Sequence, residues 1–184
     1  MPGLELRELD IDDADQWIAL VLRNRDPLTA SNDGSLPPST MAEVRQWLSS
    51  IGERDFQPGI WLDGELIGHV MVSHISHARA SEQSKAEMPG SFGVGYWLDS
   101  VHTGRGYVTE ACRTLMDYVR REFGATQFVS AVKEGNPKSA AVLERLGFEV
   151  TQNSNGEMIG YRLVDPRSET ALGRTPVDGP ISAT

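Results

Sequence analysis

Two glycines flank an arginine at residues 104–106, shortly after the apolar run Val94–Leu98 and directly before a segment with strong helical periodicity. A strand, a glycine turn and a helix N-terminus together make a site for anions, because free backbone N–H groups point outward there and the helix dipole favours negative charge. Glycine also lets the backbone approach a phosphate without a Cβ atom in the way. The sequence therefore predicts a phosphate-bearing ligand at this turn.

The turn does not match the common nucleotide motifs. A P-loop would need a Gly-Lys-Ser/Thr sequence, which is absent, and a dinucleotide fingerprint would need a third glycine where Thr109 stands. The His, Asp and Glu residues do not show the spacing of metal ligands, so we predict no metal. Cys112 is the only cysteine, so no internal disulfide can form, and its place on an apolar stripe predicts a buried structural thiol.

Composition and charge are those of an ordinary globular domain. The chain has 184 residues, 39% of them hydrophobic and 23% charged, which is enough for one domain with its own core. The net charge of −9 argues against a nucleic-acid-binding surface, and it suits either an amine-bearing substrate or a surface that serves solubility. The apolar runs are too short to span a membrane and the N-terminal residues lack a signal-peptide pattern, so we expect a cytoplasmic protein without membrane contact.

Hydrophobic periodicity predicts about seven strands and about four helices. Their order predicts an α/β (α+β) domain over residues 1–164 with a mixed, mostly antiparallel sheet. Residues 165–184 lack apolar periodicity, and we expect them to form a disordered tail. The expected strands are 4–9, 60–62, 66–72, 92–98, 126–132 and a final pair within 148–164, and the expected helices are 12–22, 40–51, 107–123 and 136–146.

Polar residues mark where the helices begin. Asp12 or Asp13 can cap the first helix, and Thr40–Glu43 is a capping box for the second. Asn136 precedes Pro137, the pairing expected at a helix N-cap and first turn.

Loops are expected in three places. Residues 26–39 are rich in Pro, Gly, Ser and Asn, and residues 74–91 read as a long hairpin loop. Asn155-Gly156 is a tight hairpin turn. Within the strand 92–98, two glycines, at positions 93 and 95, suggest a β-bulge.

Two segments resemble a known family. Residues 95–111, GYWLDSVHTGRGYVTEA, resemble the acetyl-CoA-binding motif of the GNAT N-acetyltransferase superfamily, and residues 136–148, NPKSAAVLERLGF, resemble its second core motif. The detailed sequence of these two motifs is similar to that of the RimJ/RimL branch, the ribosomal-protein N-terminal acetyltransferases. The resemblance covers roughly residues 4–164, and it implies a GNAT-type fold in which two strands splay apart at the cofactor site.

The resemblance implies that acetyl-CoA is the co-substrate. Backbone N–H groups of the glycine turn would hold the pyrophosphate, with Val101 standing where the motif usually has Gln or Arg. Backbone groups at Leu98 and Ser100 would hydrogen-bond the pantetheine arm and polarise the thioester carbonyl, and Asn136 would bond the same arm. The expected pyrophosphate residues are Thr103, Gly104, Arg105, Gly106, Tyr107, Val108 and Thr109.

Acetyl transfer requires that the ammonium lose a proton, that the oxyanion be stabilised and that the departing CoA thiolate be protonated. Many GNAT members place a tyrosine acid where this chain has Leu143, and the glutamate base of some relatives is missing from the strand 92–98. The resemblance to RimL-type enzymes implies Ser139 as the acid, although Ser139 could instead only cap its helix turn or bond pantetheine. Glu157 is the candidate base, with a solvated turn carboxylate as the alternative.

Further candidates for the base are Glu110, His69 and His74, and chains of water molecules could also suffice. Trp17 or the loop 26–39 could line the acceptor pocket.

The sequence supports one leading function and two alternatives. The leading hypothesis is an N-acetyltransferase that transfers acetyl from acetyl-CoA to a primary amine by direct attack, without an acetyl-enzyme, with a protein N-terminus as the acceptor. The alternatives are acetylation of a small amine, such as an aminoglycoside or polyamine, and a non-catalytic acyl-CoA-binding module. The resemblance also raises a homodimer, because dimers are common in the family.

Overall fold

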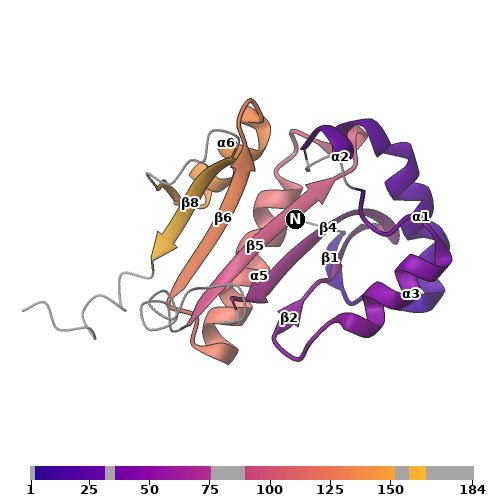
Figure 1. The fold of residues 1–184 in the computed structure, drawn as a ribbon, viewed down its shortest axis with the longest axis horizontal. Coiled ribbons are helices and arrows are strands. Elements are labelled where there is room, and N and C mark those ends of the chain that lie inside the picture. Colours follow the sequence, from indigo (N-terminus) through magenta and orange to yellow (C-terminus); the bar gives the residue numbers. More distant parts are fainter. Residues whose placement is uncertain (1–2, 32–35, 76–89, 152–157, 165–184) are drawn as a thin grey trace, which may run out of the picture.

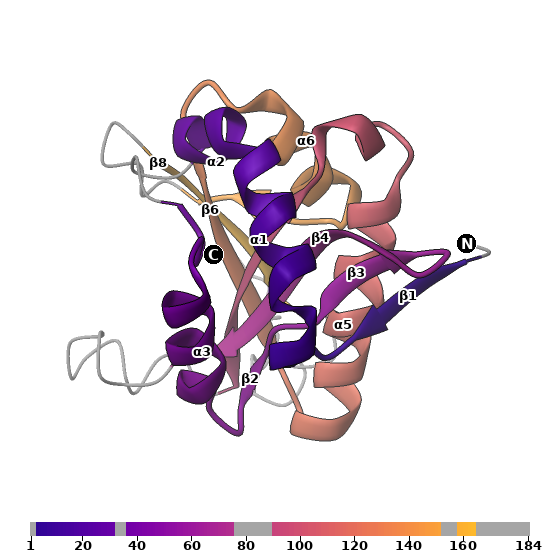
Figure 2. The same ribbon diagram turned by 90° about the vertical axis from the view of Figure 1, so that its right-hand side faces the viewer.

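The computed structural model of the chain describes residues 3–31, 36–75, 90–151 and 158–164. Within these ranges, helices cover both faces of one sheet (Figures 1 and 2). The helices are α1 (Ala14–Arg23), α2 (Arg25–Ser31), α3 (Met41–Ser50), α5 (Tyr107–Phe123) and α6 (Pro137–Arg145). The strands are β1 (Leu4–Arg7), β2 (Asp55–Phe56), β3 (Gly59–Leu62), β4 (Glu65–His74), β5 (Ser91–Leu98), β6 (Gln127–Lys133), β7 (Glu149–Val150) and β8 (Met158–Val164).

The eight described strands form one mixed sheet in the order β1-β3-β4-β5-β6-β8-β7, and β2 pairs with β4. The β5–β6 pair is parallel, and the other described pairs are antiparallel. The prediction of a mixed, mostly antiparallel α/β fold is confirmed. The structure adds strand β2 and helix α2 to the elements that periodicity indicated. No helix in the described ranges is both long and apolar enough to cross a membrane.

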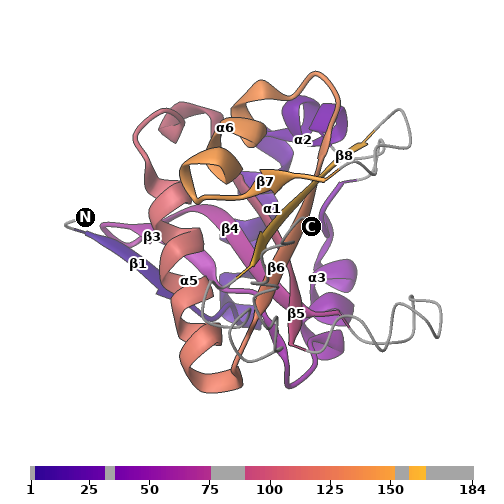
Figure 3. The same cartoon turned by 90° about the vertical axis from the view of Figure 1, so that its left-hand side faces the viewer.

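Each face of the sheet has its own apolar core. Helices α5 and α6 pack on one face (Figure 3), and α1 and α3 pack on the other. The spacing of its buried apolar residues explains how α5 packs, because positions three and four apart lie on one side of a helix. Those residues are Val108, Ala111, Cys112, Leu115, Met116 and Val119. Cys112 is fully buried, as predicted.

The helix caps are mostly where the sequence indicated. Thr40–Glu43 forms the expected capping box, and Asn136 caps α6. At the first helix, Asp13 is the N-cap residue of α1, one of the two residues expected there, but its side chain makes no cap hydrogen bond to that helix. Its carboxylate instead accepts the Asp10 N–H at 3.2 Å and bonds Arg7 at 2.7 Å, as part of a capping box that Asp10 and Asp13 form at a 3-10 turn (Ile11–Asp13) leading into α1.

Part of the expected loop 26–39 is helical. Helix α2 begins at Arg25, and its Pro27 lies in the first turn, where a backbone N–H has no intrahelical partner to lose. Leu28 on this helix is buried in the same core as α1. Burial of one leucine therefore outweighed the loop-like composition of the segment. Most of the expected hairpin loop 74–91 and the turn Asn155-Gly156 lie outside the described residues.

The bulge expected in β5 is absent from its pairing with β4, which runs in unbroken register from Phe92 to Leu98. The register shift of this sheet lies instead between Ile60 and Trp61 in β3. Gly95 has a packing role, since a Cβ atom there would lie 2.7 Å from the Met71 side chain. The glycine therefore allows close packing and does not mark an extra residue.

Strands β5 and β6 pair over only three residues and then part (Figure 1). Pairing ends at Gly93 opposite Val129. Just beyond, the Ser130 hydroxyl donates to the carbonyl of Val94 at 2.9 Å. From there to Leu98, β5 stays paired with β4 alone. This is the splayed strand pair that the resemblance to the GNAT superfamily implied.

A histidine is buried within an aromatic cluster between the sheet and the first helices. The His69 ring lies 5.2 Å from the Trp17 ring and 5.5 Å from the Trp47 ring, centroid to centroid. Burial lowers the pKa of His69 from 6.5 to about 4, with a backbone hydrogen bond at Gln57 opposing the shift. Its Nε2 atom has no hydrogen-bond partner among the described residues. The folded protein therefore keeps this imidazole neutral.

We predict that stability falls as the pH drops from 6.5 towards 4. In that window the unfolded chain binds a proton at His69 that the folded protein does not, so acid favours unfolding. The loss should reach about 3 kcal/mol near pH 4 and vanish above pH 6.5. Urea unfolding across this range measures it. The variant His69→Gln, which cannot titrate, should show a smaller loss, and an equal loss in both proteins would contradict the prediction.

Candidate active site

A cleft of about 890 Å³ lies where β5 and β6 part. The end of β5, the glycine turn, the first turns of α5 and α6, and helix α2 all contribute to its lining. The sequence-predicted residues that line it are Leu98, Thr103, Gly104, Gly106, Tyr107, Val108, Thr109, Asn136 and Ser139. The fold therefore gathers two distant motifs around one cleft.

Three predicted residues do not line the cleft or cannot be placed. Ser100 is outside the lining, and its N–H donates to the Asn24 side-chain oxygen at 3.0 Å. Arg105 is exposed and also outside the lining. Glu157 lies outside the described residues.

The glycine turn has the geometry of an anion site. Gly104 and Gly106 have φ angles of 79° and 82°, a left-handed conformation that side chains with a Cβ disfavour. Gly106 is the N-cap of α5 and offers no side-chain bond to the helix. The first intrahelical bond runs from the Glu110 N–H to the Gly106 carbonyl at 3.0 Å. The amides of residues 107–109 precede that bond, so they are the orphan donors that suit a pyrophosphate.

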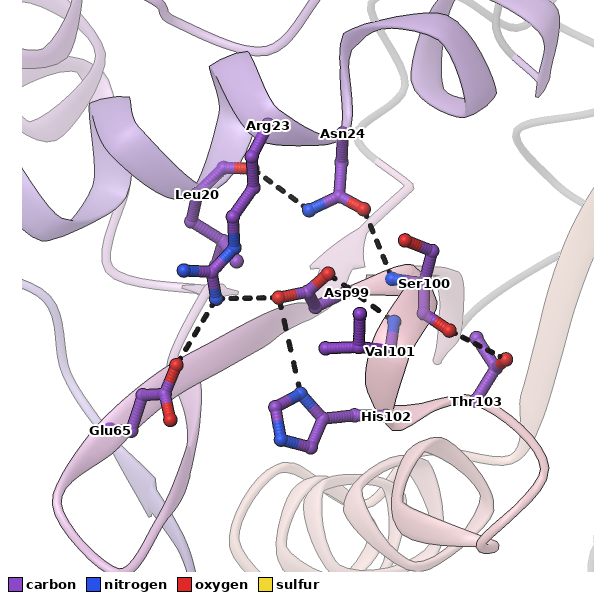
Figure 4. A network of polar contacts seen from close by, with 9 residues as sticks. All are labelled: Leu20, Arg23, Asn24, Glu65, Asp99, Ser100, Val101, His102 and Thr103. Atoms are coloured by element: carbon purple, nitrogen blue, oxygen red, sulfur yellow. Dashed lines mark hydrogen bonds and ion pairs between the residues drawn. The ribbon is translucent and has the colours of Figure 1, made fainter.

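A buried carboxylate anchors the turn to helix α1 (Figure 4). Asp99 is only 2% exposed, and it pairs with Arg23 from the last turn of α1. Burial alone would raise its pKa, but the neighbouring polar side chains of Asn24 and Arg23 and the charge of Arg23 outweigh burial and hold the pKa of Asp99 below its ordinary value. The same carboxylate accepts the Val101 N–H, at 3.5 Å. The segment before the glycine turn is therefore held by a charged contact.

Asn24 makes the second link between α1 and the turn. Its side-chain oxygen accepts the Ser100 N–H, while its side-chain nitrogen donates to the Leu20 carbonyl at 3.0 Å (Figure 4). Asn24 is buried and lines the cleft. The sequence does not indicate this contact, because nothing local marks an asparagine at a helix end as a partner of residue 100.

Basic side chains also line the cleft, and their charge favours a phosphate-bearing ligand. One of them, Lys133 at the end of β6, donates to the carbonyl of Ala30 in α2 at 3.1 Å, so it bridges β6 and α2. Glu110 lines the cleft as well and pairs with Arg113 at 2.8 Å. The basic residues are Arg113, Lys133, Lys138 and Arg145. The described residues hold no group of three or more His, Cys, Asp or Glu side chains arranged to bind a metal ion.

Ser139 contacts Tyr96, a tyrosine that was not among the predicted site residues. The Ser139 hydroxyl donates to the Tyr96 oxygen at 3.1 Å, and the Tyr96 hydroxyl donates to the Ser139 carbonyl at 2.9 Å. Burial raises the pKa of Tyr96 far above its ordinary value, so the phenol keeps its proton. One feature of the sequence could have pointed to Tyr96: it is a tyrosine within an apolar strand, next to the place where two strands were expected to diverge.

Asn136 caps the first turn of α6, and Leu143 lies in its second turn. The Asn136 side-chain oxygen accepts the Ser139 N–H at 3.2 Å, which confirms its cap role and fixes the start of the helix beside the cleft. Leu143, one turn after Ser139, is fully buried, so it belongs to the core. His69 does not line the cleft. The hydroxyl groups of Ser139 and Tyr96, which both line the cleft, therefore lie together at the first turn of α6.

Comparison with known proteins agrees with this arrangement. The model of the acetyltransferase (GNAT) domain family matches residues 3–149. "Putative ribosomal N-acetyltransferase YdaF" of Bacillus subtilis (strain 168) is 27% identical over 151 residues, which cover 79% of this chain and 77% of that protein.

Two solved structures share the fold. The ribosomal-protein-S5-alanine acetyltransferase from Vibrio fischeri superposes with a TM-score of 0.75 at 22% identity, covering 90% of this chain and 95% of that chain. Mycobacterium smegmatis RimJ in complex with CoA-disulfide gives a TM-score of 0.73 at 20% identity, covering 89% of this chain and 83% of that chain. With a family match over most of its length and a cleft that suits a phosphate-bearing cofactor, this chain belongs to the GNAT acetyltransferase family and is an acetyl-CoA-dependent N-acetyltransferase.

Proposed function

We propose that this enzyme acetylates the α-amino group at a protein N-terminus, by direct attack of the amine on the thioester of acetyl-CoA. The observation that carries the direct route is the state of Cys112. This thiol is fully buried, and burial raises its pKa to about 12, so it is neither accessible nor ionised as a nucleophile would be. A covalent acetyl-cysteine is therefore not part of the proposed route.

The acceptor assignment is supported by the relatives. YdaF and the Vibrio fischeri protein are both named as acetyltransferases of ribosomal proteins. The net charge of −9 also favours a basic partner, which many ribosomal proteins are.

In the proposed mechanism, most groups that act on acetyl-CoA are backbone amides. Residues 107–109 would hold the pyrophosphate, and the unpaired side of β5 near Leu98 would bond the pantetheine arm as an added strand would. Ser139 would protonate the departing thiolate, since it lines the cleft and carries a hydroxyl. Glu157 stays the candidate base that the sequence suggested.

The acceptor is tested with a panel of amines. We expect CoA thiol release with peptides that carry a free N-terminus, and none with the same peptides after N-terminal blocking, even where they retain a lysine. Aminoglycosides and polyamines are the competing acceptors. Faster release with a polyamine than with every free peptide would contradict the proposal. Tight acetyl-CoA binding without release for any amine would favour a binding module.

Gly106→Glu should abolish acetyl-CoA binding. The substitution adds bulk and negative charge at the helix N-terminus and strains a residue whose φ is 82°. Calorimetry should show affinity reduced by about 100-fold or more, a change of about 3 kcal/mol. Gly106→Lys is the matched control, because it carries similar bulk and strain with the opposite charge. It should bind more tightly than the Glu variant, and equal affinities would remove the charge argument.

Ser139→Ala should lower kcat by about 100-fold and leave acetyl-CoA affinity nearly unchanged, because general acid catalysis contributes about that much. Alanine keeps the helix and the backbone N–H that bonds Asn136. The control is Ser49→Ala, a helix serine on α3 whose side chain bonds only its own helix. A loss of affinity with little change in kcat would make Ser139 a cofactor ligand.

A further inference from the structure

Tyr96 crosses the opening between β5 and α6 to reach Ser139. It lies on the part of β5 that is no longer paired with β6, and both of its hydroxyl contacts are to Ser139. Tyr96 and Ser139 line the cleft together with the glycine turn. Their contact therefore lies inside the site and involves the residue proposed as the acid.

A serine hydroxyl is a weak acid, and a hydrogen bond donated to its oxygen makes the loss of its proton less unfavourable. Loss of the proton leaves charge on the oxygen, and a donor aimed at that oxygen stabilises the charge. A phenol can supply such a bond, because its hydroxyl both donates and accepts. Tyr96 is placed for this role, since its oxygen lies 3.1 Å from the Ser139 hydroxyl oxygen.

Two arrangements of the hydroxyl protons fit the same heavy-atom positions. In the first, Tyr96 donates to the Ser139 carbonyl at 2.9 Å and the Ser139 proton points at Tyr96. In the second, the Tyr96 proton rotates onto the Ser139 hydroxyl oxygen, which frees the Ser139 proton for the cleft. The second arrangement is the one that an acid needs, and it requires no movement of the backbone.

The phenol can remain a donor throughout the reaction. Burial raises the pKa of Tyr96 well above that of a free phenol, so its proton is not given away. Leu143, one helical turn further along, is fully buried and offers no hydroxyl. Among the described residues, the partner of the Ser139 hydroxyl is Tyr96.

We propose that Tyr96 is a positioning residue for acetyl transfer, which orients the Ser139 hydroxyl and stabilises the charge that develops on its oxygen. The inference rests on the proposed function, because it takes Ser139 as the acid. The C–S bond of the tetrahedral intermediate breaks, and its electron pair goes to sulfur. Sulfur takes the Ser139 proton, and Ser139 takes the proton that the acceptor nitrogen loses as it becomes an amide. No proton leaves Tyr96.

Tyr96→Phe tests the proposal, because it removes the hydroxyl and keeps the ring. We expect kcat to fall by about tenfold or more, while the acetyl-CoA dissociation constant stays within about threefold. A purely structural role would weaken cofactor binding and lower the melting temperature together with kcat. Tyr118→Phe is the matched control, an exposed tyrosine on α5 outside the cleft, and it should leave both constants unchanged.

The double variant Tyr96→Phe/Ser139→Ala shows whether Tyr96 acts through Ser139. If it does, removing the Tyr96 hydroxyl from the Ser139→Ala enzyme should cost less than about twofold in kcat. If the kcat losses of the two single variants multiply in the double variant, the inference is overturned. An unchanged kcat in the single variant Tyr96→Phe would overturn it as well.

Failure of the proposed function gives a different result from failure of this inference. If the wild-type enzyme acetylates a small amine and no peptide, the acceptor proposal fails, and the Tyr96 comparison is made with that amine. If Ser139→Ala keeps full kcat while Tyr96→Phe loses it, Ser139 is not the acid and the positioning role is also refuted.

Discussion

The short parallel pairing of β5 with β6 is the constraint on which the rest of the site depends. The strands bond for three residues and then part, so one side of β5 loses its partner from Val94 onward. Unpaired backbone groups are costly unless something bonds them. The Ser130 hydroxyl bonds the first carbonyl, and the remaining groups face a cleft that suits an extended, amide-rich ligand such as pantetheine. The same divergence makes room for Tyr96 to reach α6.

The glycine turn is useful only if its amides are held in place, and that depends on α1. The Asp99 carboxylate and the Asn24 side chain tie the segment after β5 to the last turn of that helix (Figure 4). A buried carboxylate is expensive unless it is paired, so Arg23 is a structural requirement of this anchor. Because α1 leads directly into α2, which lines the cleft, the helices on one face of the sheet are coupled to the glycine turn.

Sequence patterns predicted the features that depend on neighbouring residues. The glycine turn, the capping box Thr40–Glu43, the cap at Asn136 and the buried stripe of α5 all appear where expected. The errors arose where distant packing decided the outcome. Leu28 is buried against α1 and makes a helix of a loop-like segment, and Met71 packs over Gly95, which accounts for that glycine without a bulge. Neither contact has a signature in the nearby sequence.

Short sequence motifs are sufficient to predict the family and its acetyl-CoA co-substrate, and they mark the glycine turn as the expected anion site, because the geometry of such motifs is local. Which side chains meet in the cleft depends instead on the tertiary fold. Tyr96 and Ser139 are 43 residues apart, Asn24 and Ser100 are 76 apart, and Ala30 and Lys133 are 103 apart. Such pairs form because the sheet order and the helix packing bring them together. A hydrogen bond depends on a distance of about 3 Å between two atoms, and residue type and spacing do not specify that distance over such separations.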